Sequence, residues 1–455
     1  MQQVDKISRE DALKLISKSS IYGNLGLFIG AGMSMAILNT EWNKVALSWK
    51  ELIFKCAEEF NISLKNDINT EGLSYPEIAT EIAKLIALNK DISYKLAIKE
   101  LKEKISEITC WYPENQKRLE YNEIIENIDP NWIITTNYDL IIECLLTGKC
   151  LSLGPNDQLI SPQNLIPIYH LHGIRTAPDS IIISQEDYIS LFRPNQYRQQ
   201  KLSLSIKEST TLIIGYGLGD VNVLTAVDWT KNVYINQRIN YPHDIIQLLY
   251  TEKPKILPYR DRNEILIIEF DNLENILKEI GAIIIQEKKI DKERNENLKE
   301  LNAIFQDPSK ENVNKFIDDE IFRKGVIESI SKNDVKLISG FLVMFSKSIE
   351  ETWLRAEPRG AFEAYNQNLK LLLDVLEIID LFKIPPALLE SIAYNFDQVS
   401  YYIGTFSGAS KSAYRTWQNR KNEIPTESLI ELYNIGRSRN YYDLKKLLEP
   451  LIPLN

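Results

Sequence analysis

Short apolar runs of five to seven residues recur between segments of helical spacing in the first 285 residues of this 455-residue chain. Uninterrupted runs of this length are typical of strands that are buried on both faces of a parallel sheet. The runs expected to form strands are 25–29, 132–136, 166–171, 180–184, 210–216, 244–250 and 264–270. Because helices separate these runs, the pattern predicts a Rossmann-like, doubly wound α/β fold with a mostly parallel sheet.

Helical spacing dominates the rest of the chain. A helix capped by Ser8 precedes the first run, and the stretch from about Ser48 to Asn127 shows helical spacing without a convincing strand, which predicts a helical insertion. The charge-dense segment that begins at residue 286 follows the last apolar runs. We therefore expect an α/β domain over 1–285 and an all-helical domain over 286–455.

Composition narrows the class of protein. A net charge of −10 and a pI near 5.2 disfavour direct binding to nucleic acid or to an anionic membrane. No apolar stretch has the length of a membrane helix and the amino terminus lacks the apolar core of a secretory signal, so we expect a cytoplasmic protein. The four cysteines form no C-x-x-C pair, which favours reduced thiols and excludes a four-cysteine zinc ribbon.

A glycine-rich turn follows the first expected strand, where Gly30, Ala31, Gly32 and Ser34 begin a helix. Such a turn lets backbone N–H groups approach a phosphate, because glycine has no Cβ to block the contact. Met35 stands where the dinucleotide fingerprint has its third glycine. A tight turn that binds nothing fits this segment equally well. No P-loop motif occurs in the sequence.

Three further polar segments end apolar runs, at the strand ends where open α/β sheets bind ligands. The first holds Thr136, Asn137 and Asp139, for which a helix cap is the alternative interpretation. The second holds His170 and His172, two of the chain's three histidines. The third holds Gly215, Gly217 and Asp220, which predict a second loop lined by backbone, with a plain turn as the alternative.

His170 and His172 flank a single residue, and Gly173 follows them. Residues two apart on a strand share a face, which suits a metal site, but a third ligand is not evident nearby. A histidine beside glycine at a strand end is better suited to act as a general base, the role we assign to His172. A histidine satisfied within the core remains the alternative for His170.

The order of these motifs resembles the sirtuin family over roughly the first 285 residues. The resemblance implies that Gly30 to Ser34 bind the pyrophosphate of NAD, that Asn137 and Asp139 lie near the nicotinamide ribose, and that His172 is catalytic. Thr136, Gly215, Gly217 and Asp220 complete the expected NAD-binding set. The two C-x-x-C pairs of the sirtuin zinc module are missing, so no zinc is expected. A long helical insertion stands in place of a segment that sirtuin deacylases carry.

This departure is similar to sirtuin-like proteins of bacterial antiviral systems, which break down NAD. The resemblance therefore implies a gated NAD hydrolase with NAD as its substrate, whose helical domain regulates it or assembles a homo-oligomer. A hexameric ATPase of the HerA type is a possible partner on the same basis. The alternatives are a zinc-free protein deacylase and a module that senses NAD or ADP-ribose without chemistry. Nicotinamide release without an acyl peptide would distinguish the hydrolase from both.

Overall fold

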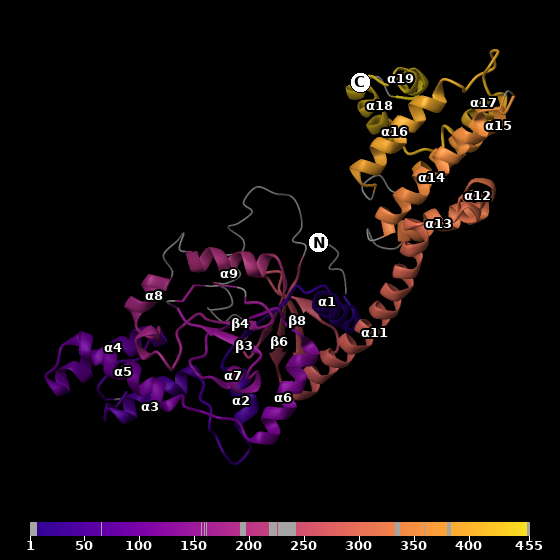
Figure 1. The fold of residues 1–455 in the computed structure, drawn as a ribbon. Helices are drawn as coiled ribbons and strands as arrows, with labels where there is room; N and C mark the ends of the chain where they lie inside the picture. Colours follow the sequence, from indigo (N-terminus) through magenta and orange to yellow (C-terminus); the bar gives the residue numbers. More distant parts are fainter. Residues whose placement is uncertain are drawn as a thin grey trace. The chain divides into compact units, whose positions relative to one another are not determined.

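The chain folds into two compact units, Met1–Ile290 and Asp291–Asn455, in a computed structural model (Figure 1). The structure describes residues 7–64, 66–155, 157–158, 160, 162–191, 197–217, 225, 243–332, 337–358, 360–379 and 384–452. Each unit has an apolar core of its own. Within the described residues, no helix combines the length and the apolar character that crossing a bilayer requires.

The first unit is built on an eight-stranded sheet of order β3-β4-β2-β1-β5-β6-β8-β7. Every neighbouring pair is parallel except β7 with β8. The strands are β1 (Leu25–Ile29), β2 (Trp132–Thr135), β3 (Cys150–Leu153), β4 (Ile166–His170), β5 (Thr210–Ile214), β6 (Ile245–Tyr250), β7 (Tyr259–Arg260) and β8 (Leu266–Phe270). The expected doubly wound fold is confirmed. The strand order reverses at β1, which pairs with both β2 and β5.

Helices cover both faces of the sheet because successive strand residues point to opposite sides. Leu25, Leu27 and Ile29 join the core beneath one set of helices, whereas Phe28 joins the core on the other face. The first set comprises α1 (Arg9–Ile21), α2 (Ala31–Leu38), α6 (Asn115–Ile128), α7 (Ile141–Leu145) and the start of α11 (Leu273–Gln306). Helix α9 (Tyr197–Lys207) packs on the opposite face and contributes Leu202 and Ile206.

The helical insertion forms a separate small core beside the sheet (Figure 1). Its helices are α3 (Trp49–Glu59), α4 (Tyr75–Lys90) and α5 (Tyr94–Ile108), and α8 (Gln185–Leu191) packs against α4. Ser48 and Glu51 form a capping box that fixes the start of α3. Helix α6 belongs to the same stretch of sequence but packs on the sheet, so the insertion proper ends with α5.

The strand prediction for 180–184 is wrong. The structure has a short 3-10 helix at Pro178–Ser180 followed by an unpaired segment. Ile181 and Ile183 are fully buried, but they pack into the core of the insertion rather than into the sheet. A short apolar run indicates that a segment is buried, but it does not show which element the segment packs against. This segment therefore has the composition of a strand without pairing with one. The short strands β3 and β7 were not predicted.

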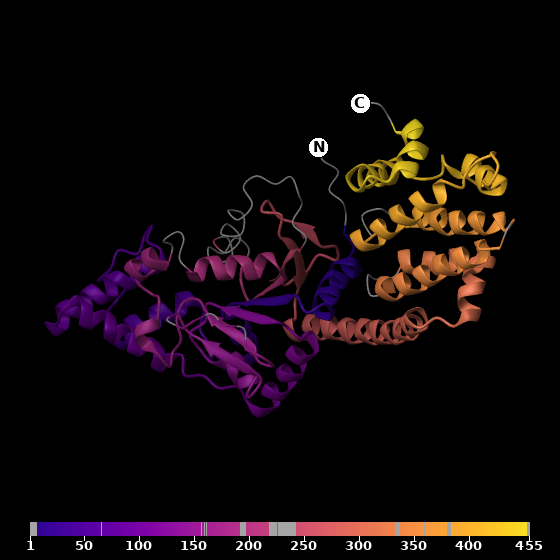
Figure 2. The ribbon, with the colours of Figure 1, turned by 45° about the horizontal axis from the view of Figure 1, so that its top comes forward.

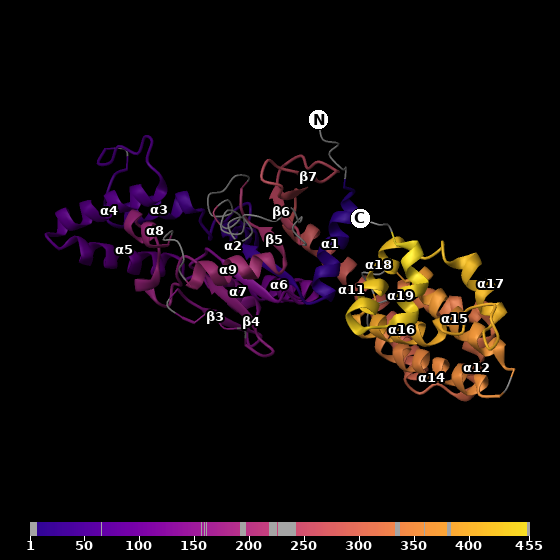
Figure 3. The same ribbon diagram turned by 90° about the horizontal axis from the view of Figure 1, so that it is seen from above.

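The second unit is helical in every described element, as expected (Figure 2). Helix α11 runs without a break from the first unit past residue 286, where the sequence predicted the boundary. The following helices are α12 (Lys310–Asp318), α13 (Glu320–Lys332), α14 (Ile338–Ala356), α15 (Phe362–Ile378), α16 (Pro386–Ser400), α17 (Lys411–Arg420), α18 (Thr426–Arg439) and α19 (Tyr442–Leu448). Helices α16, α18 and α19 pack together at its carboxyl end (Figure 3).

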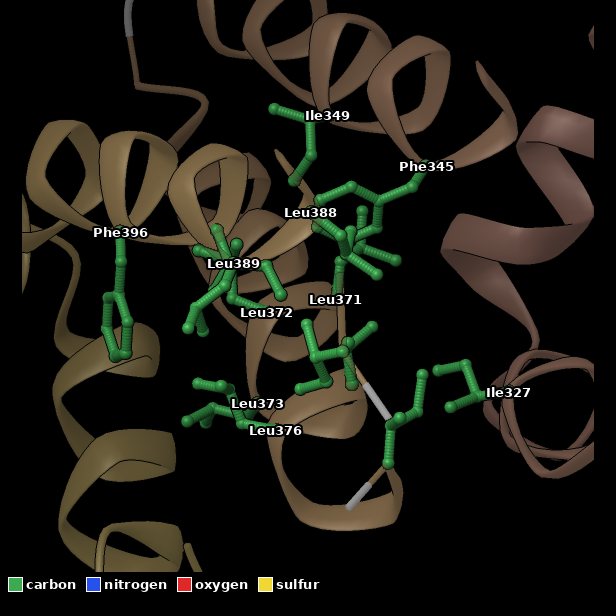
Figure 4. Packing of buried hydrophobic residues seen from close by; sticks show 14 of the residues in the cluster. Ile327, Phe345, Ile349, Leu371, Leu372, Leu373, Leu376, Leu388, Leu389 and Phe396 are labelled. Carbon is green, nitrogen blue, oxygen red and sulfur yellow. The ribbon is translucent and has the colours of Figure 1, made fainter. Parts of the chain in front are cut away.

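Leucine, isoleucine and phenylalanine side chains fill the core of this unit, among them Leu372, Leu376 and Phe396 (Figure 4). Charged side chains are buried with them: Arg323 donates to Asp374 at 2.5 Å and to the carbonyl oxygens of Phe316 and Ile317, and Arg420 donates to the same aspartate. Because these charges are paired, they are compatible with an otherwise apolar core.

Candidate active site

A cavity of about 280 Å³ lies at the carboxyl ends of β1, β2, β4 and β5. These strands are parallel, so the segments that follow them meet at one edge of the sheet, beside the point where the strand order reverses. Most of the residues predicted to form the site line this cavity. The lining residues are Ala31, Gly32, Met35, Leu47, Ser48, Trp49, Leu52, Thr109, Trp111, Thr136, Asn137, Tyr138, Asp139, His172, Gly215, Tyr216 and Gly217.

The glycine turn after β1 packs directly on the end of β5. The Gly30 N–H donates to the Ile214 carbonyl, and the Gly32 N–H donates to the Gly215 carbonyl at 3.1 Å. Gly215 has φ +80°, and a Cβ there would lie 2.6 Å from the Met33 nitrogen. The glycines are thus required for the two turns to approach each other, whether or not a ligand is bound.

This packing leaves few backbone donors for a ligand. For the Ala31 N–H, at the first position of α2, no acceptor exists among the described residues. No Lys or Arg is found among the described residues that line the cavity. The positive potential on this part of the wall therefore comes from the amino end of α2. An anionic group would meet backbone rather than a cationic side chain here.

Ser34 joins the two polar residues that follow β2. Its hydroxyl donates to Asp139 Oδ2 at 3.0 Å and accepts from Asn137 Nδ2 at 3.1 Å. Ser34 is 1% exposed and does not line the cavity, whereas Asn137 and Asp139 do. The structure therefore places Ser34 as the link between Asn137 and Asp139, each of which still contributes to the cavity wall.

Asp139 also holds the start of α7, because its Oδ1 accepts from the Ile141 N–H at 3.0 Å. The N-cap of α7 is Leu140, which forms no side-chain cap hydrogen bond, so neither Asn137 nor Asp139 is the cap residue and Asp139 instead supports the turn that leads into the helix. Burial raises the pKa of Asp139 from its ordinary 3.8 to about 6, although the hydrogen bonds from Ile141 and Ser34 act in the opposite direction. A change of pH between about 5 and 7 would therefore change the charge of the Asp139 carboxyl group.

His172 lies at the cavity against an aromatic side chain from α8. Its Nδ1 is 3.3 Å from the Tyr188 hydroxyl, and the two rings meet edge to face. Gly173 follows with φ +99°, and a Cβ there would lie 2.4 Å from the Ser180 carbonyl oxygen. The His-Gly pair therefore brings the 180–183 segment, whose Ile182 N–H donates to the His172 carbonyl, next to the histidine.

His170 does not line the cavity, and both of its ring nitrogens have partners. Nδ1 lies 3.1 Å from the Asn137 carbonyl oxygen and Nε2 lies 2.6 Å from Glu143 Oε1. Burial alone would lower the pKa of His170, but the hydrogen bond and negative charge of Glu143 outweigh it and raise that pKa. The interpretation of His170 as a satisfied core histidine is correct.

Several lining residues were not found from the sequence. Trp49 comes from the helical insertion and Trp111 from the segment between α5 and α6, so these two parts of the chain supply one wall of the cavity. Trp49 stacks on Tyr188, and its buried indole N–H has no hydrogen-bond partner among the residues that the structure describes. The sequence signal that could have indicated Trp49 is its position directly after the Ser48 cap, at the first residue of α3. Tyr216 also went unrecognised, although it follows Gly215; its hydroxyl is 2.8 Å from Thr136 Oγ1.

A second cavity of about 900 Å³ adjoins the first and shares Gly32, Met35, Gly215 and Tyr216 with it. It extends over the ends of β6 and β8 to Asp271 and Glu274. Its one lysine, Lys117, is paired with Glu274 at 2.8 Å. Two joined cavities along the carboxyl edge of the sheet match the extended shape of a dinucleotide. Asp220, predicted to bind the cofactor, lies outside the described residues.

Comparison with known proteins agrees with this geometry. Residues 131–266 match the SIR2-like domain family, a range that includes Asn137, Asp139, His172 and Gly215 but not the glycine turn. The chain is also 23% identical over 229 residues to Defense-associated sirtuin 2 of Bacillus subtilis. That match covers 49% of this chain and 21% of the relative. Residues 131–266 of the first unit are therefore similar to the SIR2-like domain family, as the order of the motifs predicted.

Proposed function

We propose that this protein hydrolyses NAD to ADP-ribose and nicotinamide. The observation that carries the proposal is that Asn137, Asp139 and His172 line the same cavity as the glycine turn. A site for binding alone needs the turn and an apolar wall, but it has no use for a histidine and an asparagine beside the place where the ribose would lie. The SIR2-like domain match supports NAD as the ligand.

The proposed reaction breaks the bond between the nicotinamide nitrogen and the anomeric carbon of the ribose. The bonding electrons pass to the pyridinium ring, which leaves as neutral nicotinamide, and the sugar acquires oxocarbenium character. A water oxygen then bonds to the anomeric carbon, and its proton passes to His172. For this role the Nδ1–H of His172 donates to the Tyr188 hydroxyl and Nε2 accepts the proton.

The remaining residues hold the substrate in place. The amino end of α2 suits the pyrophosphate, because the Ala31 N–H and the helix dipole both favour an anion there. Asn137 orients the ribose or the water with the part of its amide that Ser34 does not engage. Trp49 and Trp111 close the nicotinamide end with apolar surface and exclude bulk water.

The test is nicotinamide release from NAD by the purified full-length chain in the absence of any acylated peptide. The His172→Ala variant should lose this activity. His243→Ala should keep it, because residue 243 lies just before β6, at the amino-terminal ends of the strands, whereas the cavity lies at their carboxyl ends. If the purified protein is held inactive, NAD is measured in cells that produce each variant. Undiminished turnover by His172→Ala would refute the assignment of the base.

We further propose a role in antiviral defence, supported by the name of the relative, Defense-associated sirtuin 2. An enzyme that consumes NAD must be restrained until infection, and the helical unit offers a place for that restraint. We infer that the unit controls assembly of a homo-oligomer or the response to a partner, such as a HerA-type ATPase. Every residue proposed for the chemistry precedes it, which supports a regulatory role.

A further inference from the structure

The buried pair formed by Glu143 and His170 is not used by the proposed chemistry, yet it contacts the backbone of a residue that is. His170 ends β4 and is 2% exposed. Its two ring nitrogens face two acceptors: the Asn137 carbonyl oxygen at 3.1 Å and Glu143 Oε1 at 2.6 Å. A neutral imidazole carries one proton and can donate to one of them only.

The hydrogen bonds around Glu143 indicate where the protons lie. Ser152, on β3, donates to the same Oε1 at 2.7 Å, so this oxygen accepts two hydrogen bonds. Burial opposes both charges, but the hydrogen bond that the two side chains share outweighs it, so the pKa of Glu143 is lowered and the pKa of His170 is raised. Both shifts favour an ionised Glu143 and an imidazolium at His170 that donates to both of the acceptors it faces, and the two buried charges compensate each other.

The pair completes the restraint of Asn137. The Asn137 N–H donates to Thr135 Oγ1 at 3.0 Å, its side chain donates to Ser34, and its carbonyl accepts from His170. Loss of the His170 donor would leave a buried carbonyl without its partner and release the third restraint. A shift of about 1 Å in a group that orients a reactant can reduce turnover by about 100-fold.

We propose that Glu143 and His170 form a charged pair that positions Asn137 for turnover, with Ser152 fixing the carboxylate. The proposal rests on the proposed NAD hydrolysis. His170 is a positioning residue here and not a catalytic residue, because it does not line the cavity. The pair thus links α7, β3 and β4 to the segment after β2: Glu143 on α7 contacts Ser152 on β3 and His170 at the end of β4, and His170 contacts the Asn137 carbonyl.

The test compares kinetic constants of full-length variants. The glutamine amide in His170→Gln can turn its NH2 group toward one acceptor, and its carbonyl oxygen then faces the other. We therefore expect kcat to fall about 10- to 100-fold, with KM changed less than about threefold. His170→Lys supplies a charged donor that can serve both acceptors and should recover most of the lost kcat. Glu126→Gln is the matched control and should behave as wild type, since Glu126 lies on α6, pairs with Lys149 and does not line the cavity. Equal kcat for wild type and folded His170→Gln would overturn the proposal.

A second measurement does not depend on activity. The chain has three histidines, so ring ¹³C resonances can be assigned with His170→Gln and His172→Ala. The His170 ring should titrate above the ordinary histidine pKa in wild type, and its pKa should fall in Glu143→Gln, because that variant removes the negative charge beside it. The titratable groups near the pair are Asp139, Cys144 and Cys150, and none is altered by these substitutions. A neutral His170 ring in wild type at pH 6 would overturn the proposal.

These readouts separate the two proposals. If wild type does not cleave NAD, the proposed function fails while the resonance of His170 still reports its charge. If His170→Gln does not fold, Ser152→Ala takes its place, because it removes one donor to Glu143 and leaves His170 intact. Ser152→Ala should lower kcat several-fold in the same direction, and an unchanged kcat would count against the pair.

Discussion

Alanine substitution should destabilise the first unit at Gly215 and leave its stability unchanged at Gly217, although only one residue separates the two glycines. At Gly215, φ is +80°, and the added Cβ would lie 2.6 Å from the Met33 nitrogen and 2.7 Å from the Gly30 oxygen. Both neighbours are backbone atoms, which cannot rotate away as a side chain can. At Gly217, which also lines the cavity, no described atom lies within 4 Å of the added Cβ.

The cost at Gly215 has two parts. A left-handed backbone costs a residue with a Cβ about 1–2 kcal/mol, and the overlap with the glycine turn adds about 1–3 kcal/mol. Gly215→Ala should thus lower the free energy of unfolding of the first unit by about 2–5 kcal/mol, with a melting temperature lower by about 2–4 °C per kcal/mol. Gly217→Ala should stay within about 0.5 kcal/mol of wild type.

Thermal unfolding followed by circular dichroism, with tryptophan fluorescence to follow the first unit, checks both variants. Titration with NAD then shows whether Gly217→Ala alters the cavity without altering stability. If Gly215→Ala proves as stable as Gly217→Ala, the packing of the two turns does not require glycine. The glycine at 215 would then have to be explained by a ligand.

Three other outcomes are expected. Asn137→Ala should reduce turnover about 100-fold while NAD affinity, measured by calorimetry, changes little, because we propose that the amino end of α2 holds the phosphates; equal losses of both would show that Asn137 is mainly a binding contact. The contribution of Asp139 to the free energy of unfolding should be lost as pH rises from about 4 through 6, since the pKa of Asp139 is raised from 3.8 to about 6. At 1.36 kcal/mol per pKa unit this amounts to about 3 kcal/mol, so the difference between wild type and Asp139→Asn in urea denaturation should fall by this amount over that range; a constant difference would contradict it. A chain ending at Asn295 should differ from the full chain in particle mass by light scattering or in NAD turnover, and agreement in both would leave the helical unit without the proposed role.

The sequence determined the local features whose causes are local. An uninterrupted apolar run predicts a buried strand at 25–29, and a serine before an amphipathic stretch predicts the cap at Ser8; both are present. The order of the glycine turn, Asn-x-Asp and His-Gly motifs predicted the SIR2-like domain. It also placed these residues at strand ends, because parallel strands bring their carboxyl ends to one edge.

Tertiary structure decided what each of those residues contacts. Burial of Ile181 and Ile183 follows from the helical insertion packing beside them, which an apolar run cannot distinguish from a sheet. Trp49 reaches the cavity although it lies 88 residues before Asn137, and nothing local to either signals their proximity. The two histidines are separated by one residue, yet strand geometry and neighbours give them different environments. Glu143 and the Asn137 carbonyl enclose His170 in the core, while His172 lines the cavity, because hydrogen-bond partners are supplied by the fold and not by the sequence around each side chain.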